Sequence, residues 1–393
     1  MSVSDTTALP LAEESGPAIT PLRKGTDPMA TAAAGPWRLV ARKLVRQKLA
    51  MAAGAMIVLL YLVALFCEVI APGLPETSRA QYTFAPPQRL GLFVNKPDGT
   101  STFQLHVKGY RTEIDKVALR RTFVVDETRI VPVGFFVKGP AYTLWGLIPM
   151  DTHLIGPLRP SDPMYLLGTD RLGRDLFSRL IYGTRVSMSI GLIGVSLSLM
   201  LGVVLGALAG FYGGWVDMLI GRLVEVVSAM PTIPLWLGLA AAIPVTWSPL
   251  QVYFVITIIV SLLAWTSLAR EVRGRFLALR NEDFVTAARL DGSRERRLIF
   301  RHILPSLTSH ILAVVTLAIP TMIVAETSLS FLGIGLKPPV VSWGVLLQDA
   351  QNVRTVATAP WLLFWPAAAV VLAVLSFNFF GDGLRDAADP YHG

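Results

Sequence analysis

Apolar runs long enough to cross a bilayer recur along this chain and are separated by more polar segments. A membrane-spanning helix needs about 20 apolar residues, and six runs approach or exceed that length, at 49–71, 186–216, 220–243, 251–272, 303–336 and 361–380. The uncharged stretch 226–269 is too long for one helix, and Pro244 and Pro249 divide it. We therefore predict an all-α polytopic membrane protein with six transmembrane helices.

The segment 72–183 cannot cross a membrane, because it is rich in proline, glycine and charge. We expect it to lie outside the cytoplasm as one long extracytoplasmic segment. Within it, apolar and polar residues alternate at 102–110 and 121–137, as in half-buried strands. This alternation predicts a small β-rich insert over about 84–146, between the first two helices. An irregular loop draped over the helices is the alternative.

Charge beside the first apolar run orients the chain. A basic amphipathic stretch directly before that run carries five cations: Arg38, Arg42, Lys43, Arg46 and Lys48. Because lysine and arginine favour the cytoplasmic side, we expect residues 1–48 to be a cytoplasmic tail, largely disordered with a basic amphipathic end. Six crossings then return the C-terminus to the cytoplasm. No early apolar region indicates a cleavable signal peptide.

Composition agrees with this class of protein. The chain is 53% hydrophobic and 16% charged, whereas a soluble domain has about 25% charged residues. The net charge of +8 is better explained by orientation in the bilayer than by binding of nucleic acid. Cys67 is the single cysteine, so the chain has no internal disulfide and no cysteine-based metal site.

Three glycines recur at every fourth position of the second apolar run: Gly202, Gly206 and Gly210. This spacing lets another helix approach closely. We predict a packing face, either within the chain or between subunits. The alternative is that small residues are simply common in membrane helices.

Motifs for catalysis are missing from the sequence. It has no Gly-Lys dipeptide, and therefore no phosphate-binding P-loop for nucleotide hydrolysis. The five histidines show no metal-ligand spacing, and neither a GxSxG nor an HExxH motif occurs. We expect the chain to be neither an enzyme nor a metal-binding protein.

Two acids lie at or near membrane depth, where ionisable groups are costly and often functional. Glu225 is close to the start of the third span, where Arg222 could pair with it, and Glu326 lies in the outer half of the fifth. An ion-coupled carrier could use such acids. Acids near helix ends, however, more often form structural pairs.

The charged interval between spans four and five is the candidate functional segment. From Arg270 to Arg301 it has nine arginines and five acids, and the topology above places it in the cytoplasm. We predict a helix over 281–291 with one face of compact residues, followed by a break at Gly292. A second basic helix over 293–303 then leads to Pro305. The face of the first helix consists of Phe284, Ala287, Ala288 and Asp291. Such a face favours docking in a groove of a partner; a helix lying on anionic lipid is the alternative.

This segment resembles a motif of a known family. The pattern Thr286-Ala287-Ala288, three residues, Gly292 and then Leu304-Pro305 resembles the EAA loop of the integral-membrane permeases of bacterial ABC importers. Thr286 stands where the motif has Glu, and His302 stands where it usually has Ile. Loops of the peptide-permease branch similarly run on as RHILP. In that family the loop is the coupling helix that enters a cleft of the cytoplasmic ATPase.

The resemblance covers about residues 35–390 and includes four further stretches. These are LGTDRLGRDLFSRLIYGTRVSMSIG (167–191), AGFYGGWVDM (209–218), ETSLSFLGIGLKPPVVSWG (326–344) and NFFGDGLRDAADP (378–390). They are similar to the second, C-type permease subunit of dipeptide, oligopeptide and nickel importers. The run FFVKGPAYTLWGLIPMDTHLIG looks more like the branch linked to longer peptides and peptide-like antibiotics.

The resemblance implies the type I ABC importer permease fold, with a permease core over 184–393 and a coupling loop over 275–303. It also implies a heterodimer with a homologous permease in the bacterial inner membrane, two cytoplasmic ATPases that use ATP and Mg, and an extracytoplasmic solute-binding protein. The chain itself should bind no cofactor. The coupling residues that it implies are Asp283, Thr286, Ala287, Ala288, Gly292, Leu304 and Pro305.

Residues near helix breaks are candidates for the lining of the translocation pathway. They are Met230, Pro231 and Pro234, together with Glu225. An ion-coupled secondary carrier and a membrane receptor are the alternative functions. A carrier would need ion-coupling residues at mid-membrane, and a receptor would need a cytoplasmic output domain.

Overall fold

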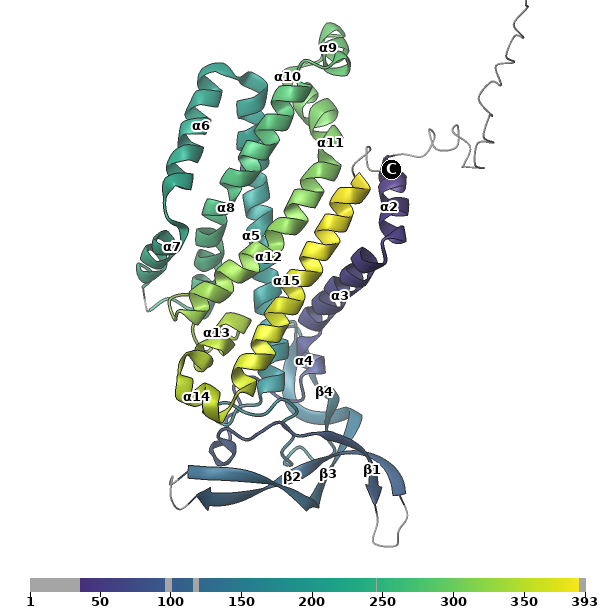
Figure 1. Ribbon diagram of the computed structural model, residues 1–393, viewed down its shortest axis with the longest axis vertical. Helices are drawn as coiled ribbons and strands as arrows, with labels where there is room; N and C mark the ends of the chain where they lie inside the picture. The colour runs from purple at the N-terminus through teal and green to yellow at the C-terminus, as the bar shows by residue number, and fades with distance from the viewer. Residues whose placement is uncertain (1–35, 96–100, 116–119, 245, 389–393) are drawn as a thin grey trace, which may run out of the picture.

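The computed structural model describes residues 36–95, 101–115, 120–244 and 246–388, and it shows a helical bundle with a β-sheet at one end (Figure 1). The predicted tail before residue 36 lies outside the described residues. The long helices of the bundle are α3 (Lys48–Leu65), α5 (Leu176–Tyr212), α8 (Pro249–Leu279), α12 (Thr308–Phe331) and α15 (Trp361–Ala388). Shorter helices at the sheet end are α4 (Cys67–Ile70), α13 (Trp343–Gln348) and α14 (Val353–Thr358), with short turns η1 (Ala80–Tyr82) and η3 (Asp349–Gln351).

Five helices among the described residues are long and apolar enough to cross a membrane, and they are the five long helices of the bundle. The predicted third span is a bent pair instead of one helix. Its parts, α6 (Gly214–Ala229) and α7 (Thr232–Ala241), meet at 83° across Met230 and Pro231. Proline at this position lacks an N–H for a continuous helix. The bundle therefore has five spans, or six if the bent pair is counted as one.

The second span begins earlier than predicted. We expected the extracytoplasmic segment to continue to 183, but α5 begins at Leu176. Asp175 caps it, because its carboxylate accepts from the backbone N–H of Ser178 at 2.8 Å and from that residue's hydroxyl at 2.6 Å. Arg179 lies in the first turn of the helix but is buried, because it pairs with Asp170.

Four antiparallel strands form a sheet between α4 and α5, in the order β1-β2-β3-β4. They are β1 (Leu90–Asn95), β2 (Ser101–Asp115), β3 (Arg120–Leu144) and β4 (Ile148–Pro157). The predicted insert ended at 146, whereas the last strand extends the sheet to Pro157. This strand was missed because IPMDTHLIGP carries proline near both ends, a pattern that favours a loop.

The three glycines of α5 pack against α8 of the same chain. All are buried, and a Cβ added at Gly202 would lie 2.9 Å from the Leu268 side chain. Added at Gly210, it would lie 2.5 Å from Cβ of Phe276. The two backbones thus approach more closely than any side chain would permit. One apolar core then joins α3, α5, α7, α8, α12, α13 and α15.

We expect Gly206→Ala to lower the thermal stability of the purified transporter. Its Cβ would lie 2.5 Å from the Ala269 carbonyl oxygen and 2.9 Å from Cβ of Val272, and overpacking of this kind costs about 1–3 kcal/mol. Gly221→Ala is the matched control, because nothing lies within 4 Å of a Cβ there. Differential scanning fluorimetry measures both; equal melting temperatures for the two variants would contradict the tight helix contact.

Candidate functional site

The segment between α8 and α12 forms a chain of short helices at the end of the bundle opposite the sheet (Figure 1). Its elements are α9 (Asp283–Leu290), α10 (Glu295–Arg297), the π-helical turn η2 (Leu298–Ile303) and α11 (Leu304–Ser306). Gly292 separates α9 from α10 and has a φ of +76°, a conformation that glycine adopts without the penalty of a Cβ. Helix α2 (Pro36–Arg46) and the last turn of α15 lie at the same end of the molecule.

Helix α9 has one buried face and one exposed face. Val285 is fully buried and Ala288 nearly so, whereas Phe284, Ala287 and Leu290 are exposed. We predicted that Ala287 and Ala288 lie together on one exposed face, and this prediction is wrong for Ala288. Ala288 faces the protein, because successive residues of a helix are about 100° apart and the packing of Val285 fixes the rotation.

The buried face of α9 belongs to a core cluster that joins the helix to the bundle. Val285 and Ala288 share this cluster with Phe276 of α8 and with Leu298 and Ile303 of η2. Packed side chains therefore connect α9 to the end of α8, with η2 as its direct neighbour.

Polar contacts also join helices at the end of the bundle where α9 lies. The Tyr212 hydroxyl, at the end of α5, donates to Glu295 at 3.0 Å. Arg273 of α8 pairs with Asp217 in the first turn of α6, and its Nη2 donates at 2.7 Å. These contacts link the end of α5 to α10, and α8 to the start of α6.

The other residues implied for coupling lie around α9. Asp283 and Thr286 are exposed on it, and Gly292 is exposed just after it, with nothing within 4 Å of an added Cβ. Leu304 packs against the core cluster beneath α9, and Pro305 is exposed in α11, beside the start of α12. The structure brings the predicted residues together at one end of the molecule.

A cavity of about 550 Å³ lies between α6, α7, α8 and α12. This volume is within the range of sites that hold small ligands. The lining is mostly apolar, with polar groups that converge from all four helices: Ser228, Thr232, Ser267, Arg270 and Thr321, beside the ring of Trp236. The sequence alone could not identify this set, because its members come from separate spans and share no spacing.

The four predicted pathway residues lie near this cavity but do not line it. Met230 and Pro231 form the break between α6 and α7, and Pro234 is exposed in the first turns of α7. Glu225 is exposed and accepts from Arg222 at 2.8 Å, which confirms the predicted ion pair. The break itself turns the chain so that Thr232, rather than these residues, reaches the cavity.

Glu326 is fully buried outside the cavity and is bonded by serine hydroxyls from three places in the chain. Ser330 and Ser342 donate to its Oε1 at 2.8 and 2.7 Å, and Ser187 donates to its Oε2 at 3.3 Å. Each hydroxyl also accepts from a backbone N–H, those of Leu336, Val345 and Trp343 respectively. The carboxyl group thus joins α5, α12 and α13, a structural role.

A second charged cluster fixes the loop before α5. Asp170 is buried and accepts from Arg179 and from Nε of Arg174, the latter at 2.7 Å. Asp349 of η3 lies 3.8 Å from the Arg179 guanidinium. Burial raises the pKa of the Asp349 carboxyl, and the positive charge of Arg179 opposes this rise. The cluster joins the sequence motif LGTDRLGRD to the segment between α12 and α15.

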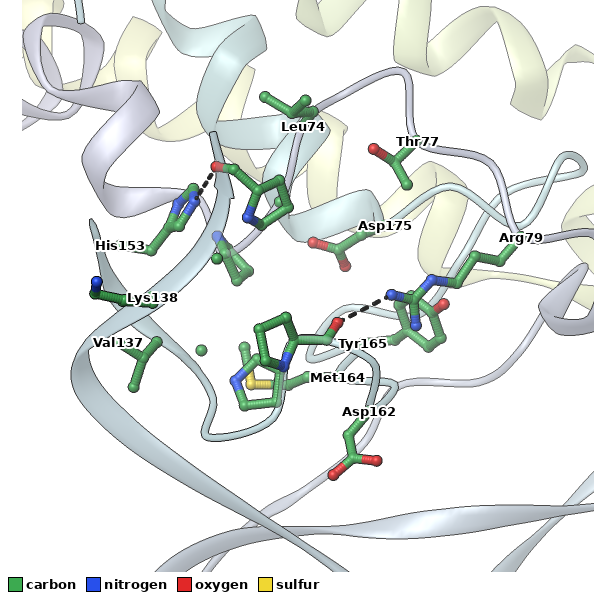
Figure 2. A pocket seen from close by; sticks show the side chains of 17 residues that line it. Leu74, Thr77, Arg79, Val137, Lys138, His153, Asp162, Met164, Tyr165 and Asp175 are labelled. Carbon is green, nitrogen blue, oxygen red and sulfur yellow. Dashed lines mark hydrogen bonds between the residues drawn. The ribbon is translucent and has the colours of Figure 1, made fainter. Parts of the chain in front are cut away.

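A small hollow of about 80 Å³ marks the junction of the sheet and the helices (Figure 2). His153 of β4 is buried there, with Nδ1 2.5 Å from the Ala71 carbonyl oxygen and Nε2 3.0 Å from that of Pro140. The hollow is smaller than the 300–1,000 Å³ typical of ligand pockets. We interpret it as a joint that holds the sheet against the end of α4.

Comparison with known proteins gives the family. The model of the binding-protein-dependent transport system inner membrane component matches residues 202–391, and that of the N-terminal TM domain of oligopeptide transport permease C matches 35–87. The oligopeptide transport system permease protein OppC of Bacillus subtilis (strain 168) is 37% identical over 61% of this chain and 76% of its own length. The chain belongs to the C-type permease family of peptide ABC importers. The resemblance seen in the sequence is thereby confirmed.

Other relatives of this permease are named after dipeptide and glutathione transport systems. The dipeptide transport system permease protein DppC of Alkalihalophilus pseudofirmus is 39% identical over 61% of this chain and 76% of its own length. The glutathione transport system permease protein GsiD of Pectobacterium atrosepticum is 39% identical over 57% and 72%. A solved structure of the MetNI methionine ABC transporter has a TM-score of 0.44 and 15% identity over 54% of this chain and 97% of that chain, a likeness too low to support an argument. The permease is a multipass inner-membrane protein and a subunit of a transporter, not an enzyme.

We expect Glu326→Leu to prevent assembly of the importer and Glu326→Gln to preserve it. Leucine leaves the hydroxyls of Ser187, Ser330 and Ser342 without their acceptor, at about 1–3 kcal/mol for each group left unpaired. Glutamine keeps one oxygen that can accept. Size-exclusion chromatography of the co-expressed complex measures both variants; full assembly and uptake with leucine would show that the hydroxyl contacts are dispensable.

Proposed function

We propose that this permease forms half of a translocation pathway for peptides or peptide-like solutes, as one member of a heterodimer with a homologous permease. Two cytoplasmic ATPases drive it, and an extracytoplasmic binding protein delivers the solute. The chain has the type I ABC importer permease fold and binds no cofactor, because ATP and Mg are used by the ATPases. The observation that carries the proposal is the position of α9, exposed on one face and packed into the bundle on the other.

The exposed face of α9 is the contact with an ATPase. Phe284, Ala287 and Leu290 lie at steps of three residues and are exposed, and Leu290 is 83% exposed. An apolar stripe of this kind is costly in water, but it can enter a hydrophobic groove of a partner. Asp283, Thr286 and Gly292 lie at the margins of this face. Ala288, Leu304 and Pro305 support it from below or from the side.

Movement of α9 passes directly to the cavity. Phe276 and Val272 of α8 pack in the core cluster under α9, while Ala264 and Ser267 of the same helix line the cavity. A force applied to α9 by closing ATPases therefore moves one wall of the cavity as a rigid body. This is alternating access by relative movement of helices around a fixed site.

The cavity is this chain's contribution to the pathway. Its apolar walls suit peptide side chains, and the hydroxyls of Ser228, Thr232 and Thr321 can bond a peptide backbone. Glu225, Met230, Pro231 and Pro234 act in this proposal through the bend that places α7 beside the cavity. They do not bind the solute within this chain.

The membrane orientation follows from the charges at the two ends of the bundle. The α9 end carries the arginine-rich segment 270–301, and the cations of α2 lie at the same end. We therefore place that end, with both termini, in the cytoplasm. The sheet formed by β1 to β4 then lies outside the cytoplasm, where a solute-binding protein would dock.

The carrier and receptor alternatives have less support. Glu326 is enclosed by serine hydroxyls away from the cavity, and Glu225 pairs with Arg222 on the surface. Neither acid is placed to couple an ion to a solute in the cavity. In the part of the chain that the structure describes, the residues after α9 return directly to a span and form no output domain.

We expect Ala287→Glu to abolish uptake by the complete importer without unfolding the permease. Ala287 is exposed on α9, so a longer, charged side chain meets only the docked ATPase. Ala357→Glu is the matched control, because Ala357 is also an exposed alanine on a helix, α14, at the sheet end of the molecule. Solute uptake and recovery of the ATPases with the tagged permease are measured together. Normal uptake in Ala287→Glu would refute the docking role of this face.

We expect Thr321→Trp to reduce uptake while the ATPases stay bound. Thr321 lines the cavity, and an indole would fill much of its opening. Val324→Trp is the control on the same helix, because Val324 is exposed outside the cavity lining. Transport into proteoliposomes is compared with the amount of assembled complex. Equal uptake by both variants would mean that the solute passes elsewhere.

A further inference from the structure

The turn between β3 and β4 carries exposed apolar side chains. Leu147 is 79% exposed, Ile148 is 48% exposed and Trp145 is 45% exposed. A water-facing hairpin turn normally has polar or small residues. This tip therefore has the composition of a surface that is covered in the working protein.

The tip lies at the end of a membrane-spanning helix. The Trp145 indole N–H donates to the carbonyl oxygen of Leu65, the last residue of α3, at 2.8 Å. Its ring centroid is 5.8 Å from that of Phe66. Leu62 and Leu65 of α3 are themselves exposed. The apolar tip thus continues the outward-facing surface of a span.

The guanidinium group of Arg185 also contacts this end of α3 and indicates the level of the lipid headgroups. Arg185 of α5 donates to the same Leu65 carbonyl oxygen at 2.9 Å and pairs with Glu68. Arginine side chains near the ends of spans keep their charge at the level of the lipid headgroups. Tryptophan is enriched at this level, because its ring is apolar and its N–H is polar.

The backbone of Trp145 has an energetically unfavourable conformation, so other contacts must hold this residue in place. Trp145 has a φ of 52°, which a bulky residue rarely adopts, and Gly146 follows with a φ of 72°. An unfavourable conformation persists where surrounding contacts repay it, often at a functional position. The contacts here are those of the indole with the end of α3.

We propose that the β3–β4 tip inserts into the boundary between headgroups and acyl chains of the outer leaflet, with Trp145, Leu147 and Ile148 in contact with lipid. Continuity with the exposed face of α3 favours lipid over a protein partner. This inference rests on the proposed placement of the sheet outside the cytoplasm. The inserted tip anchors the sheet to the bilayer surface, in addition to its joint with α4.

Spin labels in the complete importer test the depth of the tip. Leu147→Cys and Ile148→Cys are labelled with a nitroxide and reconstituted in vesicles of phosphatidylethanolamine and phosphatidylglycerol, without the binding protein. Cys67 is fully buried and stays in place, and the unlabelled protein measures its background. Phe103→Cys is the control, because Phe103 is an exposed apolar residue that packs on Phe93 in the β1–β2 pair.

We expect labels at 147 and 148 to be relaxed several-fold more by oxygen than by a water-soluble nickel chelate, and the label at 103 to show the reverse. Strong relaxation by nickel at 147 and 148 would place the tip in water and overturn the proposal. Protection from both reagents would indicate a protein partner and would also overturn it. Uptake is measured in the same vesicles, so an inactive importer with a lipid-exposed tip would count against the proposed function alone.

Discussion

The close backbone contact between α5 and α8 is the interaction on which the rest of the molecule depends. Gly210 makes it possible at one end of α5, where its partner is Phe276. The same phenylalanine is part of the core beneath α9. Because the glycines of α5 have no side chains, α8 packs close to α5, and this contact positions Phe276 in the cluster that also contains Val285 of α9. A larger side chain at Gly202 or Gly206 would also displace Phe276, because α8 is one continuous helix.

In the proposed function, α8 connects the surface that an ATPase would contact with the cavity that a solute would cross. Val272 of α8 belongs to the cluster that includes Val285 of α9, and Ser267 of α8 lines the cavity, so one continuous helix connects the two. The bent pair of α6 and α7 lines the other side of the cavity, with an 83° break between its two parts. In the proposed function, one straight helix and one bent pair thus form the walls of a cavity that opens to each side of the membrane in turn.

Features that depend on local sequence could be predicted, and those that depend on distant partners could not. The lengths of the apolar runs predicted the spans. The spacing of Gly292 and the residues before it predicted a helix where α9 lies. The first turns of α5 were missed, because Arg179 looks incompatible with a buried helix until Asp170, from the preceding loop, neutralises it. The inward orientation of Ala288 depends on packing against η2. The cavity was missed because it belongs to no single segment.

The entrance and exit of the β-sheet lie side by side, with the backbone N–H of Gly73 donating to the Ser178 hydroxyl at 3.1 Å. The segment between them leaves the bundle and returns to it at one place. The two family models match 35–87 and 202–391, so most of this segment lies between the matched ranges. Because the entropy of closing a loop grows only slowly with its length, such an excursion can lengthen or shorten in evolution without strain on the helices. In the proposed orientation, the outer surface of this importer can therefore change in size without altering the packing of the helices.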